Sequence, residues 1–162
     1  MIATAAELYV HAIAIEREAK ARYAEFAEHM ADLDSHAVAA LFRLLASEED
    51  RHLEALLRRT EGVKLPGLDA DHGWLREGAA PETAARELVF RLMTERDALR
   101  IALLAEKRAR AFFEHAARVA DDPAVRALAR EMAAEEAGHM VLIERLLERT
   151  PARQVDWESA FE

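Results

Sequence analysis

The chain has 162 residues, enough for one domain with a buried core, and 52% of them are hydrophobic. It contains no cysteine, which excludes disulfides, thiolate metal sites and thiol catalysis. The formal net charge of −9 argues against a nucleic-acid-binding protein, because phosphate contacts require a basic surface.

Hydrophobic residues recur at steps of three and four in four long segments, a spacing that places them on one face of a helix. The predicted helices span about residues 4–30, 36–60, 94–120 and 123–149. Two of them begin at Thr4 and Thr94, each three residues before an acid, which is the spacing of a capping box. Short aspartate-rich turns separate the first helix from the second and the third from the fourth. We therefore expect two antiparallel helical hairpins.

The two hairpins repeat one another along the chain. The first helix aligns with the third at an offset of 90 residues, and the second aligns with the fourth at an offset of 87. Residues 61–93 connect the two hairpins, and this segment is too long for a hairpin loop. It contains a short amphipathic helical pattern in "PETAARELVFRLM". Two helical hairpins with one long crossover are typical of the ferritin-like four-helix bundle. We predict this all-α fold as a single domain over residues 1–162, with a C-terminal tail at 150–162.

The hydrophobic stripe of each predicted helix is interrupted near its middle by polar residues. A single glutamate interrupts two of the stripes, and Glu-x-x-His interrupts the other two. When a hairpin folds back at its turn, residues equally far from the turn lie side by side, and the glutamates of each hairpin meet this condition. We therefore expect six side chains to share one buried space at mid-bundle: Glu16, Glu49, His52, Glu106, Glu136 and His139.

Buried carboxylates without a counter-charge are too costly to remain unpaired, and no lysine or arginine lies on the stripes at this level. Metal ions would supply the missing positive charge. Four glutamates and two histidines suit two cations of iron or manganese better than zinc, and they match the ligand pattern of di-iron carboxylate proteins. The alternative, a metal-free interaction bundle, leaves the buried acids unexplained.

Three further residues lie near this predicted site. Glu48 and Glu135 each precede a predicted ligand, and we expect them to be solvated or to contact a ligand from outside. Tyr23 lies two helical turns beyond Glu16, where it is either a core aromatic residue or a hydrogen-bond donor to a ligand glutamate.

The sequence resembles the rubrerythrin-like domains of the ferritin superfamily. "AIEREAKARYAEFA" followed by "EEDRH" is similar to the first half of such a domain, and "ALLAEKRARAFFEHA" followed by "EEAGH" to the second half. The resemblance covers the four helices and implies that the six residues above are the metal ligands. Two features differ from classical rubrerythrins: the cysteines of a rubredoxin module are absent, and Ala109 stands where a further glutamate is usual. The ligand set is then the symmetric one, as in bacterioferritin and designed di-iron bundles.

The resemblance implies a di-metal carboxylate protein with two iron ions, manganese being the alternative metal. The expected function is that of an oxidoreductase of the peroxidase or ferroxidase type, which reduces peroxide or dioxygen while iron(II) is oxidised in oxidative stress or iron handling. An iron storage or delivery protein of the ferritin type is the alternative, ahead of an oxygenase.

The expected partners are an external electron-donor protein and further copies of this chain, in a homodimer or higher homo-oligomer. No stretch approaches 18 uninterrupted hydrophobic residues and the first residues lack a basic segment, so we expect neither a membrane span nor a signal peptide. The expected location is the cytoplasm.

Overall fold

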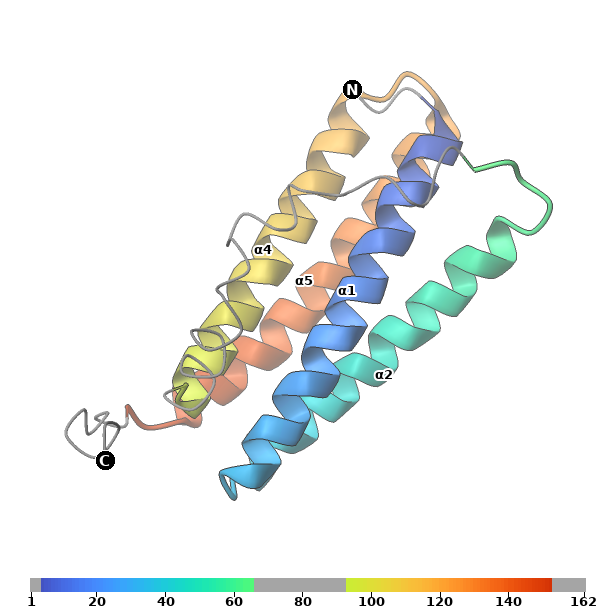
Figure 1. Cartoon of the computed structure of the whole chain (residues 1–162). Helices are drawn as coiled ribbons and strands as arrows, with labels where there is room; N and C mark the ends of the chain where they lie inside the picture. Colours follow the sequence, from blue (N-terminus) through green and yellow to red (C-terminus); the bar gives the residue numbers. More distant parts are fainter. Residues whose placement is uncertain (1–3, 66–92, 153–162) are drawn as a thin grey trace, which may run out of the picture.

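Four helices account for most of the residues described by the structure, a computed structural model that covers residues 4–65 and 93–152. The helices are α1 (Ala5–Asp32), α2 (His36–Arg59), α4 (Glu95–Val119) and α5 (Pro123–Arg149). Neither described range contains a strand, and the four helices form a bundle (Figure 1). The predicted all-α bundle is therefore confirmed. The predicted crossover helix and most of the C-terminal tail lie outside the described residues.

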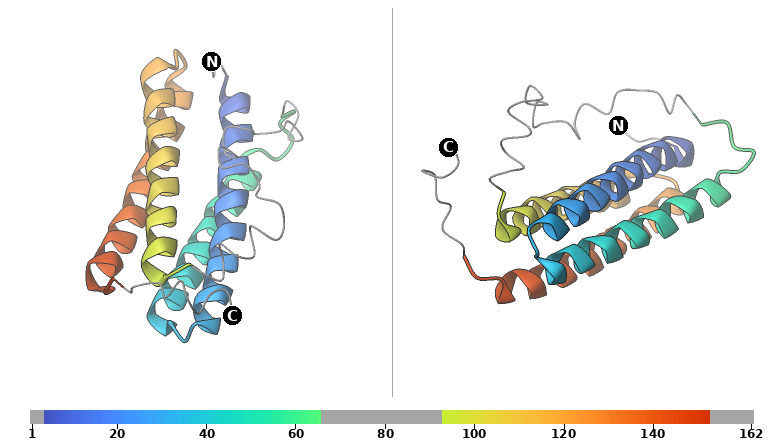
Figure 2. Two further views of the ribbon diagram at one scale, coloured as in Figure 1. Left: turned by 60° about the vertical axis from the view of Figure 1, so that its left-hand side comes forward. Right: turned by 60° about the horizontal axis from the view of Figure 1, so that its bottom comes forward.

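The bundle consists of two hairpins that pack against each other. α1 packs along α2 and α4 packs along α5, while α1 contacts both α4 and α5, and α2 contacts α5. The views in Figure 1 and Figure 2 show α2 ending at one end of the bundle and α4 beginning at the other. The end of α2 and the start of α4 therefore lie at opposite ends of the bundle, and all four helices have their middles at a common level.

Three of the four helices, α1, α4 and α5, begin at a side-chain cap. Thr4 accepts a hydrogen bond from the Glu7 amide at 3.2 Å, and the Glu7 carboxylate accepts one from the Thr4 amide at 3.1 Å. Thr94 forms the same reciprocal pair with Asp97 at the start of α4. Asp122 caps α5, which has proline at its first position, where no amide donor is needed. Each hairpin thus has a defined starting point, which sets the height of the glutamate in its first helix.

The hydrophobic core lies above and below the level of the acidic residues, in two clusters. One cluster contains Leu8 and Phe113, and the other contains Phe26 and Phe42. Phe42 is fully buried although it lies beside the predicted stripe of α2, and its ring stacks on Tyr23 with centroids 5.8 Å apart. A helix packed against two neighbours buries a wider face than a single stripe, which explains the burial of Phe42.

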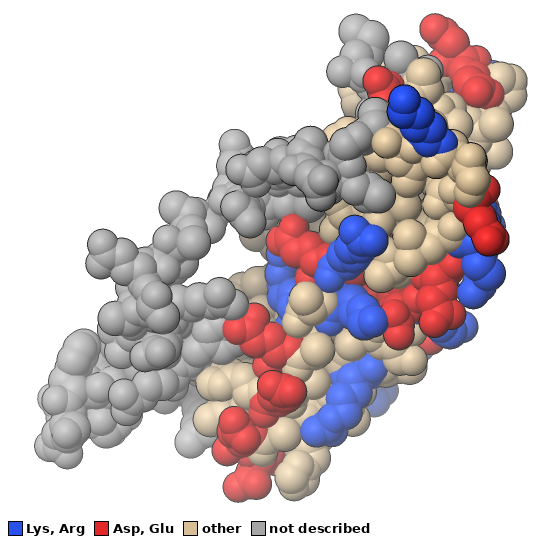
Figure 3. Space-filling view, turned by 45° about the vertical axis from the view of Figure 1, so that its right-hand side comes forward, with Lys and Arg blue, Asp and Glu red and all other residues tan. Residues whose placement is uncertain are grey.

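The surface carries both signs of charge. On the face shown in Figure 3, acidic and basic side chains are interspersed with uncharged residues, and no extended basic area is seen. Among the described residues, no helix is long and apolar enough to cross a membrane.

Candidate metal centre

All six predicted ligands lie at mid-bundle and face the interior. α1 contributes Glu16 and α4 contributes Glu106, while α2 and α5 each contribute a glutamate and a histidine one turn later. The four glutamates are between 1% and 3% exposed and His139 is 4% exposed, whereas the side chain of His52 is 17% exposed. The helical period accounts for this placement, because each ligand continues a row of buried hydrophobic residues. Their role as metal ligands stays a prediction.

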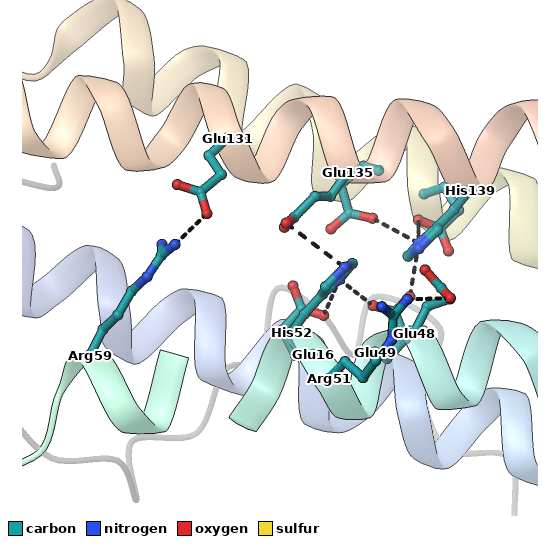
Figure 4. A network of polar contacts seen from close by, with 11 residues as sticks. Glu16, Glu48, Glu49, Arg51, His52, Arg59, Glu131, Glu135 and His139 are labelled. Carbon is teal, nitrogen blue, oxygen red and sulfur yellow. Dashed lines mark hydrogen bonds and ion pairs between the residues drawn. The ribbon is translucent and has the colours of Figure 1, made fainter. Parts of the chain in front are cut away.

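The two imidazoles point the same ring atom towards the carboxylates. His52 Nδ1 lies 3.5 Å from Glu49 Oε2 and 3.7 Å from Glu16 Oε2. His139 Nδ1 lies 3.1 Å from Glu49 Oε1, 3.6 Å from Glu106 Oε2 and 3.9 Å from Glu136 Oε2. The two rings stack with centroids 5.5 Å apart and an interplanar angle of 13°. Figure 4 shows His52 of α2 and His139 of α5 both beside Glu49.

The ligand atoms form two overlapping groups, each with atoms within 4.8 Å of one another. One group comprises Glu16, Glu49 and His52, and we call it the exposed position, because His52 is the most accessible of the six. The other comprises Glu49, Glu106, Glu136 and His139, and we call it the buried position. Glu49 belongs to both groups, so one carboxylate can serve two cations, as a bridging ligand does in two-metal sites.

Several of these polar atoms have no hydrogen-bond partner. Both oxygens of Glu16, both oxygens of Glu49 and Nδ1 of His139 are buried and unsatisfied. The 3.1 Å approach of His139 to Glu49 is thus an ionic contact without hydrogen-bond geometry. In the described part of the chain, no lysine or arginine pairs with any of the six residues. Unsatisfied buried carboxylates are strongly disfavoured, so this donor set fits cations at both positions.

Protons take the place of metal charge when no cation is bound. Burial raises the pKa of Glu16 well above its usual value, and nearby Glu49 adds to this shift. Burial likewise raises the pKa of Glu136 well above its usual value, with a further contribution from Glu106. Burial alone would raise the pKa of Glu49 as well, but the adjacent imidazoles of His139 and His52 outweigh it and lower the pKa to about 2.

The pKa values of both imidazoles are raised, as expected for groups beside carboxylates. Contacts with Glu16 and Glu49 raise the pKa of His52 to about 10. Burial opposes protonation of His139, but Glu106 and Glu49 outweigh it and raise the pKa to about 10. The metal-free site at neutral pH therefore contains two imidazolium ions facing an ionised Glu49, and the raised pKa values of Glu16 and Glu136 favour their protonated forms.

Tyr23 hydrogen-bonds a predicted ligand, one of the two roles predicted for it. Its hydroxyl donates to Glu106 Oε1, so the acceptor lies on α4 of the other hairpin. The side chain is fully buried, and burial together with the Glu106 carboxylate raises the pKa of Tyr23 well above its usual value. Tyr23 therefore stays protonated and holds Glu106 in one orientation.

Glu48 and Glu135 lie outside the six residues. Glu135 Oε1 lies 3.8 Å from His52 Nε2, the ring nitrogen other than the one near Glu16 and Glu49 (Figure 4). The side chain of Glu135 is 31% exposed. Glu48 pairs with Arg51 and lies close enough to His52 and His139 for a shared cation. Glu135 thus contacts both His52 and the solvent.

Comparisons with known proteins agree with the four-helix fold. The family model for rubrerythrin matches residues 7–71. Among solved structures, an uncharacterized conserved protein from Magnetospirillum magnetotacticum MS-1 is similar to this chain with a TM-score of 0.82 and 33% sequence identity, over 94% of this chain and 99% of that one. No curated protein matches the chain significantly. The similarity to the solved structure extends over both hairpins, whereas the family model covers the first.

Proposed function

The chain belongs to the rubrerythrin-like proteins of the ferritin superfamily, and on this premise we propose that it is a di-iron oxidoreductase that reduces peroxide or dioxygen. The observation that carries the proposal is the set of unsatisfied buried atoms on Glu16, Glu49 and His139, which lie where two cations would be held. A purely structural bundle would gain stability from hydrophobic residues at these positions.

The charges of the site suit two divalent ions. Four ionised carboxylates carry four negative charges, which two divalent cations neutralise, while the imidazoles add neutral nitrogen donors. Oxygen and imidazole ligands without thiolate favour iron or manganese. Two iron ions, when bound, supply the one-electron steps that reduce peroxide or dioxygen.

The residues of this chain prepare the site for that chemistry. Glu49 belongs to both groups of donor atoms and would hold the two ions close together. Tyr23 holds Glu106 through its hydroxyl, while the hydrophobic clusters on either side exclude bulk water. His52, the most exposed ligand, lies beside Glu135, which provides a polar contact to solvent for protons displaced from the site.

Reduction of the oxidised site requires an outside source of electrons. The chain has no cysteine that could hold a rubredoxin-type iron. We therefore include a separate electron-donor protein in the proposal, and we expect slow turnover when that donor is missing.

Anaerobic loading followed by rapid mixing with peroxide tests the function. The protein is loaded with two equivalents of iron(II) per chain, mixed with one equivalent of hydrogen peroxide, and followed by the near-ultraviolet absorption of ferric iron. We expect one fast oxidation, followed by slow recovery unless a reductant is supplied. The double variant Glu49→Ala/Glu136→Ala, which loses two predicted ligands, should fail to load and show only the rate of free iron(II).

The result that contradicts the proposal is equally clear. If the wild-type protein binds iron(II) at the site, as judged by its loss in the double variant, but the ferric absorption develops no faster than in buffer, the redox function is wrong. The metal centre would then have a non-redox role.

A further inference from the structure

The repeat in the sequence makes the two metal positions similar, but one pair of residues breaks the symmetry. Tyr23 of α1 is matched in the repeat by Phe113 of α4. Tyr23 donates a hydrogen bond to Glu106, whereas Phe113 has no hydroxyl with which to make the equivalent contact to Glu16. Both Glu16 oxygens accordingly lack any hydrogen-bond partner. Glu106 is held in place before metal arrives, and Glu16 is not.

Two further differences act in the same direction. The buried position has three carboxylates and one imidazole within 4.8 Å, whereas the exposed position has two carboxylates and one imidazole. The side chain of His139 in the buried position is 5% exposed, and that of His52 in the exposed position is 17% exposed. More negative charge attracts a divalent ion more strongly, and less water contact slows its exchange.

We propose that the two positions bind metal in a fixed order, with Tyr23 as the positioning residue that sets the difference. The buried position fills first and holds its ion tightly, and the exposed position fills second and exchanges its ion with the solution. This inference rests on the metal site of the proposed function and adds to it a stable one-metal state. When metal is limiting, the protein contains one ion per chain.

The physical basis is the ordering of ligands before binding. A carboxylate already fixed by a hydrogen bond loses little freedom when it coordinates an ion, whereas a carboxylate with no partner must be ordered by the ion itself. Residues that hydrogen-bond to metal ligands typically change metal affinity by about 10- to 100-fold when they are mutated. The Tyr23–Glu106 contact acts on one position only, so its effect appears as a difference between the two positions.

Titration with cobalt(II) under nitrogen tests the order of filling. Cobalt(II) has visible absorption bands that report the ligand environment, and competition with a chromophoric chelator gives the affinities. For the wild-type protein we expect two steps of one ion per chain, separated by about tenfold or more in affinity.

Two repeat-equivalent variants assign the steps. His52→Ala removes a ligand of the exposed position and should retain the first, tight step while losing the second. His139→Ala removes a ligand of the buried position and should lose the tight step. Circular dichroism verifies that both variants are folded. If an alanine variant does not fold, the glutamine variant at the same position, His52→Gln or His139→Gln, is used instead.

The role of Tyr23 requires its own comparison. Tyr23→Phe should weaken the first step by about 10- to 100-fold, leave the second unchanged, and shift the absorption bands of the first ion. Phe42→Leu disturbs the ring stacked on Tyr23 without removing the hydroxyl, and it should change neither step.

The possible outcomes distinguish an error in the order of metal binding from an error in the metal site itself. Two steps of equal affinity, equal losses in His52→Ala and His139→Ala, or an unchanged first step in Tyr23→Phe would overturn the inference while leaving the di-metal site intact. Failure of the wild-type protein to bind cobalt(II) or iron(II) at all would instead overturn the metal site on which the proposed function depends.

Discussion

Metal loading should release protons, because protons hold the place of metal charge in the metal-free site. The pKa values of His52 and His139 are raised to about 10, so both imidazoles are almost entirely protonated at neutral pH. Both must lose a proton from Nδ1 to coordinate metal. Glu16 and Glu136, whose pKa values burial raises well above the usual value, release further protons when they bind a cation.

The pH dependence of metal binding follows from the number of protons that the metal displaces. The two imidazoles alone predict release of about two protons per chain at pH 7, and the buried acids can only increase this number. Below the imidazole pKa values, each displaced proton makes the overall binding constant about tenfold larger per pH unit. The product of the two metal-binding constants should therefore rise by at least about 100-fold between pH 6.5 and pH 7.5.

Calorimetric titration with manganese(II) in two buffers of different ionisation enthalpy measures the proton count directly. Tyr23→Phe is the matched control, because its phenol does not titrate near pH 7 and its loss should leave the proton count unchanged. Release of fewer than one proton per chain, or an overall affinity that does not change between pH 6.5 and pH 7.5, would show that the imidazoles are neutral in the metal-free protein and refute the reasoning.

Three further predictions concern stability. The raised pKa values of His52 and His139 stabilise the metal-free fold fully below pH 6.5, and this contribution is lost as the pH rises towards about 10. The melting temperature of the metal-free protein should therefore fall over that interval, while that of the metal-loaded protein should not. Thr94→Ala removes the capping box of α4 and should lower the free energy of unfolding in urea by about 1 kcal/mol, whereas Thr94→Ser should retain most of it, and equal losses would contradict a capping role. Phe42→Ala leaves a cavity beside two aromatic rings and should cost about 3–5 kcal/mol in the same assay, so a loss below about 1 kcal/mol would show that the ring is not packed as described.

Local patterns in the sequence were sufficient to predict the helical fold. The periodic hydrophobic residues of α1, α2, α4 and α5 are predominantly buried, because a helical period of 3.6 residues places such residues on one face wherever the helix packs. The alignment of the glutamates about each turn was likewise predictable from the sequence, since a hairpin brings residues equally distant from its turn to the same height. The burial of Phe42 in the core could not be predicted in this way, because it depends on how α2 is rotated against Tyr23 and Phe26 of α1.

The sequence by itself determined which side chains could meet, and only the tertiary structure decided how they meet. Helical period and hairpin symmetry specify six residues at one level, and both are properties of one helix or one hairpin. The sharing of Glu49 between two positions, the hydrogen bond from Tyr23 to Glu106 and the approach of Glu135 to His52 all cross from one hairpin to the other. Such contacts depend on the rotation and spacing of the two hairpins, which the packing of side chains between them establishes and no local period encodes.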